Sequence, residues 1–251
     1  MSAFVISIGN TSIRFGYGRT GKLSIEKRAA LFLSDYSIVD VDALKNFILE
    51  NFGETDFNKF DKIIMASVSP VLSEPVAAAV LEIFGKSPIR IEKNLGALNT
   101  EKYMGLLGDD RIAVCARALF EYPPPLLVVD FGTATTINVV NERGEFLGGA
   151  ICVGLQTGLN ALAAHTAQLP KIRVNKKAPL IGANTKDGLL TGALLGQACL
   201  ADGYAQRTEK ELGRLTKIIT GGYAETVMPY LQNSYEYKPD LLLDGLFMLV
   251  G

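Results

Sequence analysis

The sequence predicts an α/β protein that consists of two similar domains. Strand-like and helix-like segments alternate along the chain, a pattern that favours α/β layers. The stretch Leu126–Thr136 is a short apolar run that ends in a polar residue, a glycine and small hydroxyl residues, and Phe4–Thr11 repeats this pattern. Ser7 and Asp130, the polar residues of the two stretches, lie about half of the 251-residue chain apart. We therefore expect two domains that each begin with a strand and a sharp, phosphate-sized turn.

The composition indicates a cytoplasmic protein with neither nucleic acid nor a membrane as its partner. Apolar residues make up 48% of the chain, which is enough for a substantial core. The formal net charge is −1, and lysine and arginine form no basic stripe for a polyanion. The apolar stretches stop short of the roughly 18 residues that a membrane span needs. The N-terminus enters a strand-like run without the basic region and cleavage site of a signal peptide.

The cysteines and the single histidine argue against several classes of site. Cys115, Cys152 and Cys199 are odd in number and far apart, unlike a disulfide framework or a zinc site, so we expect buried thiols that pack as small apolar side chains. His165 lies on an expected helix, where packing or surface exposure is the simpler interpretation. Without a nucleophile elbow, it does not support a Ser/His/Asp hydrolase.

The first half is expected to open with a hairpin, in which Phe4–Ile8 and Ile13–Gly16 flank Gly9, Asn10 and Thr11. Ser73 is predicted to cap a helix that has Pro75 in its first turn and that ends at Gly85. The other expected elements are a helix at about 42–51 with Leu44, Phe47 and Ile48 on one face, strands at 62–68 and 88–92, and a helix from near Asp110 to about Tyr122.

Three consecutive prolines, Pro123–Pro125, cannot continue that helix, so we place the boundary between domains 1–120 and 121–251 near this point. The second domain is expected to contain strands that lead into Asp130, cover 136–140, enter Gly148-Gly149 and cover 217–220. Its expected helices cover 156–168, about 185–212, a segment after Gly222, and 240–249.

Asp130 and the residues that follow it combine the features of a phosphate loop. Gly132 lacks a Cβ and permits a tight turn after the strand. The next backbone amides and the threonine hydroxyls can donate to phosphate oxygens, and the Asp130 carboxylate can bind a cation that neutralises phosphate charge. A plain hairpin would use the same turn residues, so this motif alone leaves both interpretations open.

Two further turns have the same ambiguity. Asn10 and Thr11 offer polar groups to a second phosphate, but asparagine and glycine are also the commonest turn residues. Gly221 and Gly222 follow the strand at 217–220, and two glycines allow a backbone to lie close against a flat ligand such as adenine. An ordinary strand-to-helix turn would look the same.

The sequence Gly108-Asp109-Asp110-Arg111 stands at an expected helix start. An aspartate near a transferring phosphoryl group can orient and deprotonate an attacking hydroxyl. An arginine can hold a carboxylate or a phosphate through two parallel hydrogen bonds. An N-terminal acid followed by a solvated arginine is the structural alternative.

In this order, the four motifs resemble the acetate kinase, sugar kinase, Hsp70 and actin superfamily, and most closely its type III pantothenate kinases. The family pattern is Asp-x-Gly-Asn-Thr, Gly-x-Asp-Arg, Asp-x-Gly-Thr-Ala-x-Thr, Gly-Gly-x-Ile-x-Pro-Gly and Thr-Gly-Gly, and this chain follows it nearly throughout. Other matching stretches are 67–70, 166–170, 182–185 and 240–246. The resemblance implies two ribonuclease H-like (actin-like ATPase) domains, each a mixed five-stranded sheet flanked by helices, with an interdomain cleft.

The resemblance also implies an activity, the ATP-dependent phosphorylation of pantothenate, which is the first step of coenzyme A biosynthesis. Asp110 would accept the proton, and Asp130 would hold a monovalent cation, K⁺ or NH₄⁺, beside ATP with Mg²⁺. The pantothenate site would include Gly108, Asp109, Arg111, Thr185 and Tyr103. The ATP site would include Ser7, Gly9, Asn10, Thr11, Arg14, Gly132, Thr133, Thr135, Gly221 and Gly222. The family works as a homodimer with its substrate site near the subunit interface.

The chain departs from the family pattern at three places. Ser7 stands where the first loop should begin with aspartate, Val153 replaces a proline, and the segment 103–107 is shorter than usual. Loss of a carboxylate that acts through a metal's outer shell typically costs about 10- to 100-fold, which predicts a weakened kinase. A non-catalytic paralogue that keeps the fold and nucleotide binding for a regulatory role is the alternative, and a kinase for another small hydroxyl compound is a third possibility.

Overall fold

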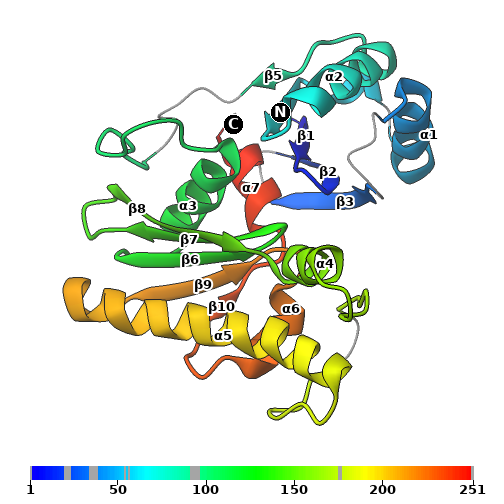
Figure 1. The fold of residues 1–251 in the computed structure, drawn as a ribbon. Coiled ribbons are helices and arrows are strands. Elements are labelled where there is room, and N and C mark those ends of the chain that lie inside the picture. Colours follow the sequence, from blue (N-terminus) through cyan, green and yellow to red (C-terminus); the bar gives the residue numbers. More distant parts are fainter. Residues whose placement is uncertain are drawn as a thin grey trace. The chain divides into compact units, whose positions relative to one another are not determined.

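The computed structural model describes residues 2–19, 24–33, 39–53, 55, 57–90, 97–174 and 177–249. Within them the chain alternates between strands and helices (Figure 1). The strands are β1 (Ser2–Ile8), β2 (Ser12–Arg19), β3 (Ile25–Phe32), β4 (Lys62–Ser67), β5 (Ile89–Arg90), β6 (Leu126–Phe131), β7 (Ala134–Val140), β8 (Phe146–Val153), β9 (Thr216–Thr220) and β10 (Glu236–Tyr237). The helices are α1 (Val41–Phe52), α2 (Pro70–Phe84), α3 (Asp109–Glu121), α4 (Leu155–His165), α5 (Thr185–Leu212), α6 (Ala224–Val227) and α7 (Leu241–Met248), with short 3₁₀ turns η1 (Phe57–Lys59) and η2 (Met228–Tyr230).

The two sheets have the same topology. The first has the strand order β3-β2-β1-β4-β5, and the second has β8-β7-β6-β9-β10 when it is followed in the same direction. In each sheet two hairpins join three antiparallel strands, and the next two strands run parallel to the central one. This confirms the expected fold, in which each half is a mixed five-stranded sheet flanked by helices.

The core of the first sheet is rich in aromatic side chains. Phe4 of β1 is fully buried, and its ring centroid lies 5.2 Å from that of Phe52 on α1 and 4.9 Å from that of Phe84 on α2. The apolar alternation along β1 and β2 directs Phe4, Ile6, Ile8, Ile13 and Phe15 to this face. The opposite face of β1 therefore carries Ser7.

The core of the second sheet is built on the long helix α5. Leu127, Val129 and Phe131 of β6 pack with small and aliphatic residues at i, i+4 and i+7 spacing on α5, namely Leu194, Ala198, Ala201 and Ala205. Figure 1 shows α5 running along this sheet. As in the first sheet, the alternate residues of the central strand point to the other face, and Asp130 is one of them.

The chain divides into two compact units. The first comprises Met1–Leu98, Met104–Arg117 and Asp240–Gly251, and the second comprises Asn99–Tyr103 and Ala118–Pro239. Helix α7 therefore belongs with the N-terminal sheet, because its apolar residues Leu243, Leu246 and Phe247 are buried and it contacts β1 to β4. The boundary expected from the proline triplet assigns these last residues to the second domain, so the compact units depart from it there.

The secondary-structure predictions hold for the two hairpins and for most helices, with several corrections. Helix α2 begins at Pro70 after Ser69, so the predicted cap at Ser73 is wrong. Ser73 is instead buried inside the helix and donates its hydroxyl to Ser67 Oγ at 2.8 Å. Strands β3 and β10 were not expected, and the predicted strand at 88–92 is confirmed at Ile89–Arg90, its last two residues lying outside the described ones.

The cysteines and the histidine differ in exposure. Cys115 is buried as expected, but Cys152 is only partly buried and Cys199 is exposed, so the expectation of three buried thiols is wrong. His165 is exposed at the end of α4, which favours surface exposure over packing among the two interpretations left open. None of the described helices is both long enough and apolar enough to cross a membrane.

Candidate functional site

The first predicted phosphate loop is the turn between β1 and β2. The turn is closed by a hydrogen bond from the Gly9 amide to the Ser12 carbonyl at 2.9 Å, which leaves the side chains of Asn10 and Thr11 exposed. Ser7 is buried, with 7% of its surface exposed, and it lies directly opposite Arg14 of β2 and beside Ala66 of β4. Directly paired residues point to the same face of a sheet, so Ser7 and Arg14 are neighbours next to this turn.

The same unit contains the start of α3, where the predicted acid and arginine lie. The Arg111 amide donates to Asp110 Oδ1 at 2.8 Å, and the Arg111 side chain is buried. A Cβ on Gly108 would come within 2.5 Å of the same Asp110 oxygen, so glycine is the residue that lets this carboxylate fold back over the helix start. Asp109 is half-buried beside it.

Burial sets the acidity of this region. Desolvation raises the pKa of Asp110 above the ordinary aspartate value, although the Arg111 amide and charge oppose the shift. Burial also raises the pKa of the Cys115 thiol, one turn further along α3, to about 12. The thiol is therefore neutral at physiological pH, and Asp110 is a carboxylate whose affinity for a proton is increased. This is the property expected of a general base.

The second predicted phosphate loop is the turn between β6 and β7 in the other unit. Asp130 lies opposite Thr136 of β7 and beside Thr220 of β9, so three oxygen-bearing side chains form one row across the sheet. The Thr136 hydroxyl accepts a hydrogen bond from the buried Asn138 side chain at 3.2 Å. Thr220 is 1% exposed, and its hydroxyl has no hydrogen-bond partner within the described part of the chain.

Helix α4 braces this second turn. The Gly132 amide closes the turn by donating to the Ala134 carbonyl at 3.1 Å, and the Thr133 carbonyl accepts from the Gly154 amide at 3.2 Å and from the Thr157 hydroxyl at 2.7 Å. A Cβ on Gly154 would clash with the carbonyls of Gly132 and Thr133. The loop is thus held against the start of the helix, and Thr135 is fully buried behind it.

The double glycine after β9 adjoins Asp130. Gly221 has φ of 99°, and a Cβ there would clash with the Asp130 carboxylate and approach the Phe131 backbone to 2.6 Å. The Tyr223 amide donates to the Phe131 carbonyl at 3.0 Å, which ties this turn to the end of β6. Gly222 is exposed next to it. Glycine is therefore required at 221 by both the backbone angle and the neighbouring acid.

Neither Thr185 nor Tyr103 belongs to the Asp130 row. Thr185 is the exposed first residue of α5, after Asn184, whose side chain accepts from the Asp187 amide at 3.0 Å. The ring of Tyr103 packs edge-on against Phe146 at 5.3 Å and lies against Gly148, which pairs with Val139.

Sequence-predicted residues therefore meet in three groups. Ser7, Gly9, Asn10, Thr11 and Arg14 surround the first turn, Gly108 to Arg111 form the start of α3, and Asp130, Gly132, Thr133, Gly221 and Gly222 surround the second turn. The prediction of individual sites omitted Thr136, Asn138 and Thr220. Hairpin periodicity places Thr136 opposite Asp130, whereas the position of Thr220 depends on pairing between distant strands, which the local pattern does not reveal.

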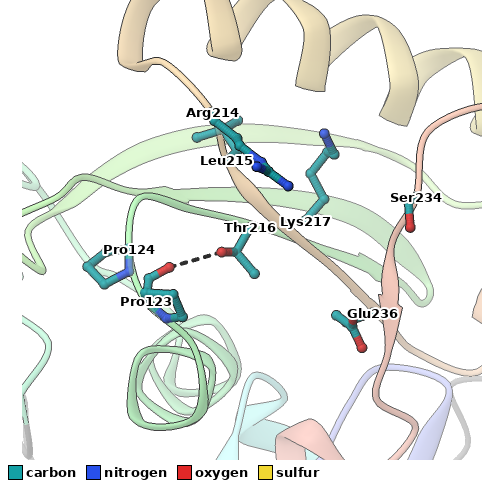
Figure 2. Close-up of a pocket in the computed structure, with 8 residues that line it drawn as sticks. All are labelled: Pro123, Pro124, Arg214, Leu215, Thr216, Lys217, Ser234 and Glu236. Carbon is teal, nitrogen blue, oxygen red and sulfur yellow. Dashed lines mark hydrogen bonds between the residues drawn. The ribbon is translucent and has the colours of Figure 1, made fainter.

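Two cavities of the second unit contain none of the predicted site residues. One of about 470 Å³ is formed at the amino-terminal ends of β6, β9 and β10, where Pro123, Arg214, Thr216, Lys217, Ser234 and Glu236 are among its lining residues (Figure 2). Thr216 begins β9 and Thr220 ends it, so the Asp130 row is about 13 Å away along the strand. Lys217 is paired with Glu209 at 2.6 Å, and the Thr216 hydroxyl donates to the Pro123 carbonyl at 3.0 Å. Lys217 and Thr216 thus already have partners in the protein, and we do not assign a ligand to this cavity.

A smaller cavity of about 230 Å³ lies between α4 and α5. Its lining is mostly apolar and rich in glycine, and includes Gly158, Leu159, Leu162, Gly188 and Gly192. It contains none of the predicted nucleotide-binding residues.

Comparison with known proteins identifies relatives that match most of the chain. Residues 3–207 match the family model of type III pantothenate kinase. The type III pantothenate kinase of Thermus thermophilus is 34% identical over 249 residues, covering 97% of this chain and 96% of that protein. That of Persephonella marina is 30% identical over 249 residues, covering 96% and 95%.

A solved structure, a ROK family glucokinase from Streptomyces griseus in complex with glucose and AMPPNP, shares the fold. It has a TM-score of 0.53 and 11% identity, and the match covers 99% of each chain. This structure shows the fold alone, whereas the family model and the relatives match most of the chain and show its family. The chain belongs to the type III pantothenate kinase family.

Proposed function

We propose that the protein phosphorylates pantothenate with ATP and so begins coenzyme A biosynthesis. The family match, which extends over residues 3–207 and is joined by relatives at 30–34% identity over nearly the whole chain, is the observation that carries this conclusion. The raised pKa of Asp110 at the start of α3 supports it, because phosphorylation of an alcohol needs an acceptor for the hydroxyl proton.

In the proposed reaction, the terminal hydroxyl oxygen of pantothenate attacks the γ-phosphorus of ATP. A new oxygen–phosphorus bond forms, the bond to the bridging oxygen of ADP breaks, and the hydroxyl proton passes to Asp110. Arg111 binds the pantothenate carboxylate through its guanidinium group, which presents paired donors. Gly108, Asp109, Thr185 and Tyr103 are proposed as further pantothenate contacts.

The two turns are proposed to bind the nucleotide. Backbone amides and hydroxyls of Gly9, Asn10, Thr11, Gly132, Thr133 and Thr135, together with Ser7, Arg14, Gly221 and Gly222, form the proposed ATP site. Mg²⁺ bound to the triphosphate would supply charge neutralisation. Among the described residues no cluster of three or more metal-ligating acids, cysteines or histidines exists, so the phosphates themselves would provide much of its coordination.

Asp130 is proposed to hold a monovalent cation, K⁺ or NH₄⁺. The donor set fits a hard cation, because Asp130 shares its row with the hydroxyls of Thr136 and Thr220, and the Thr220 oxygen is buried without a hydrogen-bond partner in the described residues. We also propose that the protein works in the cytoplasm as a homodimer. Exposed apolar residues of β8 and α4, such as Ile151, Val153 and Leu162, support an interface with a second copy. Light scattering on the purified protein will test the dimer.

The activity is tested by incubating the purified protein with pantothenate, ATP, Mg²⁺ and K⁺ and identifying phosphopantothenate and ADP. Asp110→Asn should reduce turnover by about 10²- to 10⁴-fold, the range for a positioned base. Asp42→Asn is the matched control, because Asp42 is also an acid in the first turn of a helix of the first unit, but its side chain is 78% exposed. Undiminished turnover in the Asp110 variant would refute the assigned base, and absence of product from the unmodified protein would refute the function.

A further inference from the structure

The repeated topology makes the two central turns directly comparable. Ser7 is the penultimate residue of β1, and Asp130 is the penultimate residue of β6. Each residue has one antiparallel partner on the hairpin and one parallel partner on the next strand. The partners of Ser7 are Arg14 and Ala66, and the partners of Asp130 are Thr136 and Thr220.

The two rows of side chains carry opposite charges. Asp130, Thr136 and Thr220 form a row with one carboxylate, whereas Ser7, Arg14 and Ala66 form a row with one guanidinium. The next residue along the first row, Ala30 of β3, adds no charge. The whole loop from Ser7 to Arg14 contains no carboxylate. The first turn therefore cannot hold a divalent cation through an acidic side chain of its own.

Arg14 is half-buried in this row, and within the described residues no carboxylate forms an ion pair with it. A guanidinium remains charged under all physiological conditions and presents its donors in a planar fork that matches phosphate oxygens. Ser7 adds a small hydroxyl beside it instead of a competing acid. The row is thus suited to an anion.

We propose that Arg14 binds a phosphate of the nucleotide directly and that nucleotide binding in this protein therefore depends only weakly on Mg²⁺. The inference rests on the proposed function, because the nucleotide is the phosphoryl donor of that reaction. At the first turn, the Arg14 guanidinium supplies part of the positive charge that Mg²⁺ would otherwise supply to the phosphates. Ser7 makes this possible, because an aspartate at that position would pair with Arg14 across the strands.

The test is calorimetric measurement of ATP affinity, once with excess Mg²⁺ and once with EDTA. The unmodified protein should lose less than about 10-fold in affinity when Mg²⁺ is removed. Arg14→Gln should weaken binding in EDTA by about 10- to 100-fold, the range for hydrogen bonds to charged groups, and by less with Mg²⁺. Arg14→Lys should recover part of the loss, because it restores the charge without the fork. Ser7→Asp should increase the dependence on Mg²⁺.

Arg28→Gln is the matched control, since Arg28 is a cation on β3 of the same sheet that pairs with Asp240; its affinities should equal those of the unmodified protein. Circular dichroism will establish that each variant is folded. If the unmodified protein binds ATP with Mg²⁺ and makes phosphopantothenate but loses ATP in EDTA, the inference is wrong and the proposed function stands. Equal affinities of Arg14→Gln and the unmodified protein in EDTA would also overturn it. If ATP binds under neither condition, both proposals fail.

Discussion

The turn after β1 and the turn after β6 have the same backbone plan but different chemistry. Both follow a buried central strand, both begin with a glycine, and both lead into an antiparallel partner. The first turn is one residue longer, since Gly9 bonds to Ser12 whereas Gly132 bonds to Ala134. The row behind the first turn carries Arg14, and the row behind the second carries Asp130. Apolar alternation and glycine thus determine the topology, and the few polar residues in each row determine the charge.

The surroundings of the two turns differ as well. The second turn is held by helix α4, because the Thr133 carbonyl accepts from both Gly154 and Thr157. At the first turn, the Thr11 carbonyl accepts from the Leu33 amide, just beyond the end of β3. A helix start and an edge strand are therefore alternative supports for the same kind of loop.

Among changes to the two rows, removing the charge of the second row should have the largest effect. Asp130→Asn should lower kcat/KM with ATP and Mg²⁺ by about 10²- to 10³-fold, the usual cost of losing one preorganised electrostatic contact. Titration with K⁺ should show weaker activation, because the row would keep only neutral oxygens. Glu142→Gln, at an exposed turn of the same sheet, is the control. If turnover stays within about threefold of that of the unmodified protein, Asp130 is not part of the site.

Adding a methyl group beside Asp130 should test whether Gly221 is required for the stability of the fold. Gly221→Ala places a Cβ against the Asp130 carboxylate and the Phe131 backbone, at a residue whose φ is 99°. We therefore expect the free energy of unfolding to fall by about 1–3 kcal/mol. Gly203→Ala is the control, since nothing lies within 4 Å of a Cβ inside helix α5, and it should stabilise by up to about 1 kcal/mol. Denaturant unfolding measures both, and equal stabilities would contradict the steric argument.

A smaller effect is expected at Thr220, where stability and activity should move in different directions. Its hydroxyl is buried without a hydrogen-bond partner in the described residues, and such a group is costly to keep. Thr220→Val should leave the melting temperature unchanged or higher and reduce activation by K⁺ by about 10-fold. A lower melting temperature together with unchanged activation would show that the hydroxyl has a structural role.

Asp110 differs from Asp130 in two respects. It belongs to neither row, and burial desolvates its carboxylate and so disfavours the charged form. Its folded pKa is raised, so its protonated form is favoured in the folded state, and its contribution to stability is lost as the pH rises through that pKa. Asp110→Asn should therefore melt at a higher temperature than the unmodified protein near neutral pH. This advantage should shrink as the pH falls from the raised folded pKa of Asp110 to the ordinary aspartate pKa, and it should be gone below that value. An advantage that grows on acidification would reverse the assigned direction of the shift.

Local sequence pattern predicts the hairpins and most helices, because apolar spacing and glycine or proline act within a few residues. It also suggests the start of α3, where Gly108 precedes two acids. It misses β3, because this strand includes Glu26, Lys27 and Arg28 and has no buried alternation. It misplaces the start of α2, since Ser73 has the composition of a cap but faces Ser67 within the fold.

The sequence predicts those site residues that belong to short local motifs, but not those brought together by pairing between distant strands. Motif order identifies Asp110 and Asp130, but Thr220 joins the Asp130 row through a parallel pairing of distant strands. The charge difference between the two rows likewise requires the register that sets Arg14 opposite Ser7. Long-range register depends on the whole core, and short motifs do not contain it.

Helix α7 has a consequence for biosynthesis. It buries Leu243, Leu246 and Phe247 in the unit of β1 to β4, yet it emerges from the ribosome after every strand of both sheets. The second sheet can assemble while the first still exposes the face that α7 will cover, so vectorial synthesis completes the N-terminal half last. We therefore expect the nascent N-terminal sheet to expose apolar surface, and to be prone to aggregation, until α7 has been made.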